Sequence, residues 1–199
     1  AYGYDAFLAG LDDSKKRVNT FYSKNPAYRI VHDNLQDMNE VTSSQTYQKG
    51  SWILHMLRGV VGTENFWKGI RSYYQRYINT NATTADFRRE MEEASGMDLK
   101  DFFEQWLYKP GTLQYNGSWQ YNNKKKEVKI TLEQVQSDGS LFKMPVQVAI
   151  YSSTGKPVMK TLQVNEKRNE FTLLVESEPD NIVLDPNHWV LMEAKWGKK

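Results

Sequence analysis

The sequence predicts an α + β chain of two modules: an N-terminal α-helical bundle and then an all-β, immunoglobulin-like sandwich. In the first half, apolar residues recur every three or four positions, which is typical of helices with one buried face. In the second half they alternate with polar residues, which is typical of half-buried strands. Pro110-Gly111 separates the two patterns, so we assign residues 1–111 to the helical module and residues 112–199 to the sandwich.

The helical half is expected to begin with a helix over residues 4–24 that turns Phe7, Leu8, Leu11, Val18 and Phe21 inward. A second helix carries the apolar positions of residues 52–61, and two more follow over residues 63–77 and 84–95. A short last helix holds the aromatic residues before Pro110. Small polar residues and glycines mark where these helices begin and end. The predicted caps and ends are Gly62, Thr63, Thr84, Gly96 and Asp98.

The second half is expected to contain about seven short strands, a number typical of two packed antiparallel sheets. Turn residues separate the apolar runs, as in Ser137-Asp138-Gly139. The only basic run, residues 124–126, is interpreted as a solvated hairpin tip and not as a phosphate-binding patch. The predicted strands lie near residues 119–121, 128–132, 146–150, 158–164, 171–175, 182–184 and 189–192.

The composition excludes several classes of protein. Of the 199 residues, 39% are hydrophobic and 25% are charged, as in an ordinary globular protein. No apolar run approaches the roughly 20 residues that span a bilayer, so we expect no membrane span. The net charge of +2 is small for a nucleic-acid binder, so no nucleic-acid partner is expected. The absence of cysteine excludes disulfides and thiolate metal ligands but leaves the compartment open.

No motif of known chemistry stands out at first. The three histidines, His32, His55 and His188, do not form the H-E-x-x-H pair that places two zinc ligands on one helix face. There is no G-x-S-x-G nucleophile turn and no phosphate-binding glycine loop. We therefore expect this chain itself to bind no metal.

An ordered series of short motifs nevertheless resembles one family. The segment from Thr46 to Tyr77 resembles the stretch that follows the zinc ligands in the aminopeptidase N family of gluzincin-type zinc metallopeptidases. Later, the LEQVQ segment and the VLDP of Val183 to Pro186 are similar to the β-sandwich domain that follows in many members. In the helical half, the matching residues are Tyr47, Lys49, Gly50, Leu57, Arg58, Gly62, Phe66, Tyr77, Asp86, Phe87, Gly96, Leu99, Phe102, Trp106, Leu107 and Gly111.

The resemblance implies the C-terminal part of a peptidase catalytic domain plus the following sandwich domain. Family members bind zinc through H-E-x-x-H and a later glutamate, and these ligands would lie upstream of Ala1. The resemblance then implies that the chain is a fragment of a zinc-dependent aminopeptidase that hydrolyses N-terminal residues from peptides. We expect the fragment to be inactive alone, because the zinc is bound by the parent enzyme and none is bound by this chain. Its implied partners are peptide substrates and the upstream catalytic portion of the same polypeptide. Self-association through an exposed helical face is a further expectation.

The resemblance also assigns a role to Tyr47. In the family, the tyrosine of Y-x-K-G faces the zinc across the scissile carbonyl, where a phenol can donate a hydrogen bond to the developing oxyanion. Without the resemblance, Tyr47 is interpreted as a surface aromatic at a helix start. No substrate-binding residue is predicted. The alternative function is a noncatalytic protein- or polysaccharide-binding module with a helical spacer, and the sequence upstream of Ala1 would distinguish the two.

Overall fold

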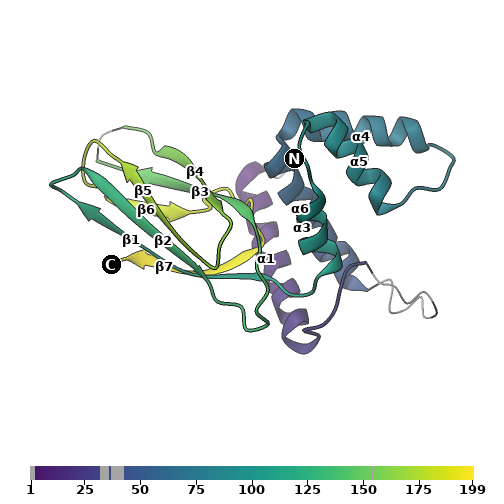
Figure 1. Cartoon of the computed structure of the whole chain (residues 1–199), viewed down its shortest axis with the longest axis horizontal. Helices are drawn as coiled ribbons and strands as arrows, with labels where there is room; N and C mark the ends of the chain where they lie inside the picture. Colours follow the sequence, from purple (N-terminus) through teal and green to yellow (C-terminus); the bar gives the residue numbers. More distant parts are fainter. Residues whose placement is uncertain (1–2, 32–35, 37–42, 154) are drawn as a thin grey trace. The chain divides into compact units, whose positions relative to one another are not determined.

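The computed structural model describes residues 3–31, 36, 43–153 and 155–199 (Figure 1). Its contacts form two compact units, one of residues 1–15 with 111–199 and one of residues 16–110. The predicted fold class, a helical part followed by a β-sandwich, is confirmed. The predicted module boundary between residues 111 and 112 stays a prediction. None of the described helices combines the length and apolar character that crossing a membrane requires.

The helical unit packs around one face of its central helix. That face buries Trp52, Met56 and Leu57, and further core side chains come from later helices, such as Met91 and Trp106. The 3.6-residue period of an α-helix places the three central residues on one side. The elements are α1 (Gly3–Lys24, shared between the two units), α3 (Ser44–Val61), α4 (Thr63–Tyr77), α5 (Thr84–Ser95), α6 (Lys100–Phe103) and the π-helical segment η1 (Glu104–Tyr108).

The predicted details of α1 and of two caps need correction. Phe7 is exposed, and the buried aromatic of α1 is Tyr22 and not Phe21, because Tyr22 lies one turn beyond the buried Val18. Thr63 makes no cap bond. The cap of α5 is Thr83 and not Thr84, because the Thr83 hydroxyl accepts from the backbone of Asp86 while the Asp86 carboxylate accepts from the backbone of Thr83. The predicted helix end at Gly96 is confirmed, since Gly96 adopts the left-handed conformation, with φ 71°.

Helices α4 and α5 lie side by side (Figure 1). Gly69 of α4 permits this approach, because an added Cβ would lie 2.7 Å from the sulfur of Met91. Between the helices the buried carboxylate of Glu90 accepts a 2.6 Å hydrogen bond from Ser72 and pairs with Arg76 at 2.8 Å. The contacts with Ser72 and Arg76 offset the cost of burying the charged carboxylate of Glu90.

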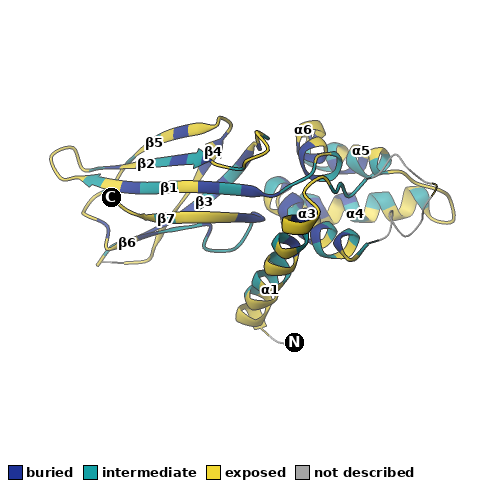
Figure 2. Ribbon diagram, turned by 90° about the horizontal axis from the view of Figure 1, so that it is seen from below, coloured by how far each residue is buried: buried dark blue, intermediate teal, exposed yellow. Residues whose placement is uncertain are grey.

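The sandwich consists of a four-stranded sheet in the order β5-β2-β1-β7 and a three-stranded sheet in the order β4-β3-β6. Alternate residues of each inner strand point into the core, so most buried positions of β1 and β2 alternate with intermediate or exposed ones (Figure 2). All pairs are antiparallel except β1 with β7. The strands are β1 (Leu113–Asn122), β2 (Glu127–Gln134), β3 (Met144–Tyr151), β4 (Val158–Val164), β5 (Arg168–Leu174), β6 (Asn181–Leu184) and β7 (Met192–Lys198).

The last predicted strand is wrong in position. Residues 189–191 precede β7 and do not form a strand. The cause is the carboxylate of Asp185, which accepts hydrogen bonds from the backbone amides of Trp189 at 2.9 Å and Val190 at 2.8 Å. Those two amides are therefore engaged in a turn and are not available to a β-ladder.

Trp196 links the two sheets. In the ladder between β7 and β1, Trp196 lies opposite Gly117. Its indole N–H donates a 2.7 Å hydrogen bond to the carbonyl oxygen of Ile182 in β6. Gly117 leaves space for the ring, because an added Cβ would lie 2.7 Å from both the Trp196 ring and the side chain of Leu132. The sandwich thus depends on a missing side chain at one inward position of β1.

We expect Gly117→Ala to lower the free energy of unfolding of the sandwich by about 1–3 kcal/mol, because the added methyl group overpacks the core. The matched control is Gly197→Ala in β7, where an added Cβ meets no described atom within 4 Å. Urea unfolding, followed through NMR signals of β1 and β6, measures the difference, and hydrogen exchange of the Trp196 indole N–H reports the bond to Ile182. Equal stability of the two variants would contradict this account of Gly117.

Candidate functional site

Tyr47, the one predicted site residue, lies in the first turn of α3. Ser43 caps this helix, and its hydroxyl accepts a 3.1 Å hydrogen bond from the amide of Gln45. The Tyr47 side chain is 72% exposed, although it is a large aromatic. Its hydroxyl forms no hydrogen bond with any described residue. The phenol is therefore free to donate to a group outside the described part of the chain.

Directly beneath this turn, Lys49 is fully buried. Its ammonium donates a 3.0 Å hydrogen bond to the Tyr22 hydroxyl and lies 4.7 Å from the centre of the Tyr22 ring. Burial disfavours the charged form and lowers the pKa of Lys49 to about 7. Burial also raises the pKa of Tyr22, so this phenol keeps its proton. In the sequence, Lys49 is recognisable only as a motif residue, and the one sign of its burial is that a lysine stands on an apolar helix face.

An apolar groove begins one helical turn beyond Tyr47, on the same face of α3. It has a volume of about 340 Å³, and Gly50 and Leu54 form its α3 side. An added Cβ at Gly50 would have no described atom within 4 Å, so the groove is open at this point. The other lining residues are Ile53, Leu57, Tyr73, Ala82, Thr83, Thr84, Phe87, Phe103 and Leu107.

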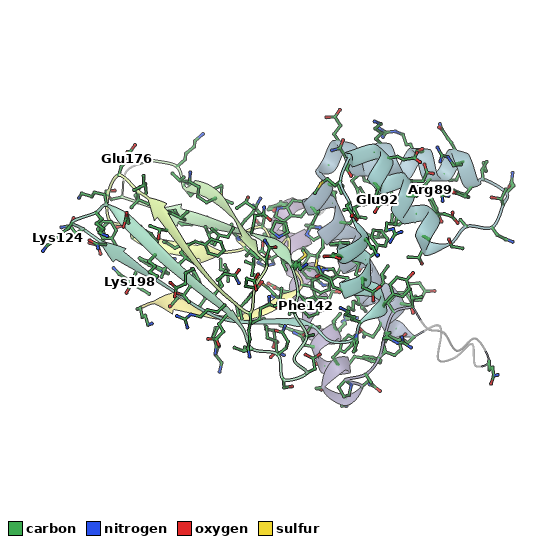
Figure 3. The ribbon with its side chains drawn as sticks, viewed as in Figure 1. Arg89, Glu92, Lys124, Phe142, Glu176 and Lys198 are labelled. Carbon is green, nitrogen blue, oxygen red and sulfur yellow. The ribbon has the colours of Figure 1, made fainter. Side chains whose placement is uncertain are left out.

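One rim of the groove is fixed by the capping box of α5. Hydrogen bonds from the hydroxyl and the amide of Thr83 lower the pKa of Asp86 to about 2, so its carboxylate is charged at neutral pH. The same carboxylate accepts from Tyr77, at the end of α4, and pairs with Arg89 of α5. Figure 3 labels Arg89 on this helix. Arg89 also donates to the Tyr77 hydroxyl. These bonds join the end of α4 to the start of α5, where Thr83 lines the groove.

No metal site is formed by the described residues. They include no group of three or more His, Cys, Asp or Glu side chains that could hold an ion. The His55 ring packs edge-on against Trp52 at 5.8 Å, and His188 lies 3.5 Å from the carboxylate of Asp12. His32 lies outside the described residues.

The sandwich motifs form turns and do not form a reactive cluster. The side chain of Gln134, from LEQVQ, donates to the backbone oxygen of Phe142 and accepts from its amide (Figure 3). Asp185, from VLDP, is buried and holds the two amides described above. Burial raises the pKa of Asp185 to about 6, against the opposing effect of these hydrogen bonds. A hollow of about 450 Å³ beside Asp185 is larger than the groove at α3, but it lies in the sandwich unit, while Tyr47 belongs to the helical unit.

Comparison with known proteins identifies similar sequences over most of the chain. Residues 9–106 match the family model described as the peptidase family M1 domain. The chain is 28% identical over 182 residues to aminopeptidase N of Escherichia coli (strain K12). This alignment covers 84% of this chain and 20% of that protein. It is 31% identical over 151 residues to probable aminopeptidase 2 of Sulfurisphaera tokodaii, covering 74% of this chain and 17% of that protein.

A solved structure has the same fold. Legionella pneumophila aminopeptidase A, in complex with aspartic acid, superposes with a TM-score of 0.73 over 86% of this chain and 20% of its own. At 19% identity, this similarity concerns the fold alone. The chain thus spans about a fifth of the length of the relatives named here.

The turn at Asp185 gives a prediction for pH. The pKa of Asp185 is about 6 in the folded chain and 3.8 ordinarily, so the folded state holds this proton more tightly. The resulting stability is present below about pH 4 and is lost as the pH rises through 6, with an upper size of roughly 2–3 kcal/mol. Asp185→Asn abolishes the titration, and asparagine tolerates the left-handed backbone at φ 46°.

The difference in unfolding free energy, wild type minus Asp185→Asn, is therefore expected to be larger at pH 4 than at pH 7. Urea unfolding, followed through NMR signals of β3 and β6, measures it at each pH. Asp180→Asn, an exposed change in the same unit, is the control. A difference that stays constant with pH would show that Asp185 is charged throughout this range.

Proposed function

Because the chain belongs to peptidase family M1, the family of aminopeptidase N, we propose that it is part of a zinc-dependent aminopeptidase that hydrolyses N-terminal residues from peptides. The resemblance noted in the sequence is confirmed by the family match over residues 9–106 and by the aminopeptidases similar to the chain. The observation that carries the proposal is Tyr47, which belongs to the Y-x-K-G motif and whose phenol is exposed on a well-packed helix.

In this proposal the Tyr47 hydroxyl donates a hydrogen bond to the carbonyl oxygen of the scissile peptide bond. Attack on that carbonyl places negative charge on the oxygen, so a donor already aimed there stabilises the transition state more than the substrate. The cap bond of Ser43 restrains the backbone of the turn that carries Tyr47, which limits the reorganisation needed during the reaction. Its exposed ring is accessible to a substrate.

The described residues do not fit a zinc site. His55 packs against Trp52, His188 faces one carboxylate, and these two histidines belong to different units. A catalytic zinc takes three protein ligands. As the family resemblance implies, we propose that the zinc ligands belong to the rest of the polypeptide and that these 199 residues alone are inactive. The relatives named above are aminopeptidases, which favours this function over a noncatalytic binding module with a helical spacer.

We also propose that the helical unit contacts the upstream catalytic portion of the same polypeptide. Trp67 and Tyr74 lie seven residues apart on one face of α4, and both are exposed. Leu54, beside the groove, is exposed as well. Large apolar side chains gathered on one surface are typical of an interaction site.

When this portion is absent, the same surface is expected to cause weak self-association. Sedimentation velocity of the 199-residue chain should show the average mass rising with concentration. Trp67→Glu should reduce this rise, because a charge on the apolar face opposes its burial. Val158→Glu, an exposed apolar position in the sandwich, is the control and should leave the rise unchanged. A strict monomer at all concentrations would contradict the proposed surface.

The role of Tyr47 is tested in the whole protein that contains this segment. Tyr47→Phe removes one hydroxyl and keeps the ring, so folding and zinc content should not change. We expect kcat on an aminoacyl reporter to fall by about 10²–10³, with little change in KM, as when one oxyanion donor is lost. Tyr151→Phe, at an exposed tyrosine of the sandwich unit, is the control. A kcat within about threefold of wild type would contradict the catalytic assignment.

A further inference from the structure

We propose that Lys49 is a positioning residue, which ties the first turns of α3 to α1 and so fixes the direction in which Tyr47 points. The proposal rests on the proposed function, because it assigns Lys49 a role through Tyr47. It concerns the lysine of the Y-x-K-G motif, which the structure buries while it leaves the tyrosine exposed.

The first link joins α3 to the end of α1. The Lys49 ammonium donates to the Tyr22 hydroxyl at 3.0 Å, and the aliphatic stem of Lys49 is enclosed in the core. Two neighbouring polar atoms on this face, Oε1 of Gln45 and Nε1 of Trp52, form no hydrogen bond with described residues. The bond from Lys49 to Tyr22 is therefore a polar link between this face of α3 and α1.

The second link returns to the helix cap. The Tyr22 hydroxyl donates at 3.1 Å to the backbone oxygen of Tyr28, and the Ser43 hydroxyl donates at 2.6 Å to the hydroxyl of Tyr28. The Phe21 ring packs edge-on against the ring of Tyr28 at 5.0 Å and holds it in place. The chain of contacts Lys49–Tyr22–Tyr28–Ser43 therefore begins and ends on α3 and encloses the turn that carries Tyr47.

Tyr47 depends on this arrangement because its own hydroxyl has no described partner. Its direction follows from the backbone of the first turn, since a helical side chain leaves the backbone in few rotamers. The first turn of a helix frays readily, because its amides lack helical partners. Anchors at Ser43 and Lys49, on either side of Tyr47, oppose that fraying.

Burying an ammonium is costly, and the lowered pKa of Lys49 reflects this cost. A methionine of similar length would fill the same space without the cost. An apolar side chain, however, makes no directional bond to Tyr22. Lys49 therefore contributes more to the orientation of the first turn of α3 than to the free energy of unfolding.

The test uses the 199-residue chain and compares Lys49→Met with Lys68→Met, an exposed lysine of α4. Backbone ¹⁵N relaxation of residues 44–48 reports the order of the first turn. We expect order parameters near 0.85 in wild type and in the control, and values below about 0.6 in Lys49→Met. Unchanged order in a folded Lys49→Met chain would overturn the proposal.

Tyr22→Phe keeps the ring and removes only the hydroxyl, so it tests the same link if Lys49→Met does not fold. It should loosen residues 44–48 without melting α4 or α5, and unchanged order would again overturn the proposal. These measurements need no activity, so they hold or fail independently of the aminopeptidase assignment.

In the whole protein, a double-mutant cycle separates positioning from general stability. Tyr22→Phe should lower kcat by about tenfold or more with KM nearly unchanged. In a Tyr47→Phe background the same change should cost little more, because the group being positioned is already gone. Fully additive losses would overturn the positioning role, whereas normal kcat in Tyr47→Phe alone would overturn only the proposed function.

Discussion

Burial of one face of α3 anchors the helical unit, because this helix shares the groove lining with α4, α5, α6 and η1 and is bonded to α1 through Lys49 and Tyr22. On this face Trp52, Met56 and Leu57 are almost completely buried. Burying each large apolar side chain stabilises the fold by about 1.5–3 kcal/mol, so the register of this face along the helix is strongly determined. Once that register is set, the position of every other α3 residue follows, including those that face away from the core.

The sandwich depends on a different requirement, because the backbone N–H and C=O groups of its turns need hydrogen-bond partners. Gln134 holds the chain at Phe142, and Asp185 holds the turn before β7. Both side chains are buried and polar, and both bond to backbone atoms. The family-like segments of this unit are thus explained by turn geometry, with no catalytic role required of them.

The sequence predicted the order of helices and strands because apolar periodicity reports burial directly. It failed where local chemistry decides. The strand expected at residues 189–192 lost two of its amides to Asp185, and a carboxylate four residues upstream of such a run leaves no periodic trace. Thr83 and Thr84 are adjacent threonines that only the position of Asp86 distinguishes. Tyr47 was found through the motif, whereas the burial of Lys49 was missed because a lysine ordinarily indicates a surface position.

The spacing of Y-x-K-G has a simple physical meaning on a helix. Each residue advances the helix by about 100°, so residues two apart point in nearly opposite directions. If Lys49 points into the core beside Tyr22, then Tyr47 must point outward, and Gly50, three residues further on, lies on the same side as Tyr47. An outward tyrosine needs an inward anchor close in sequence, and a glycine one turn on keeps the surface beside the tyrosine open. The motif therefore combines an exposed donor, a buried anchor and a clear approach within four residues, which is the arrangement that a preorganised hydrogen-bond donor requires.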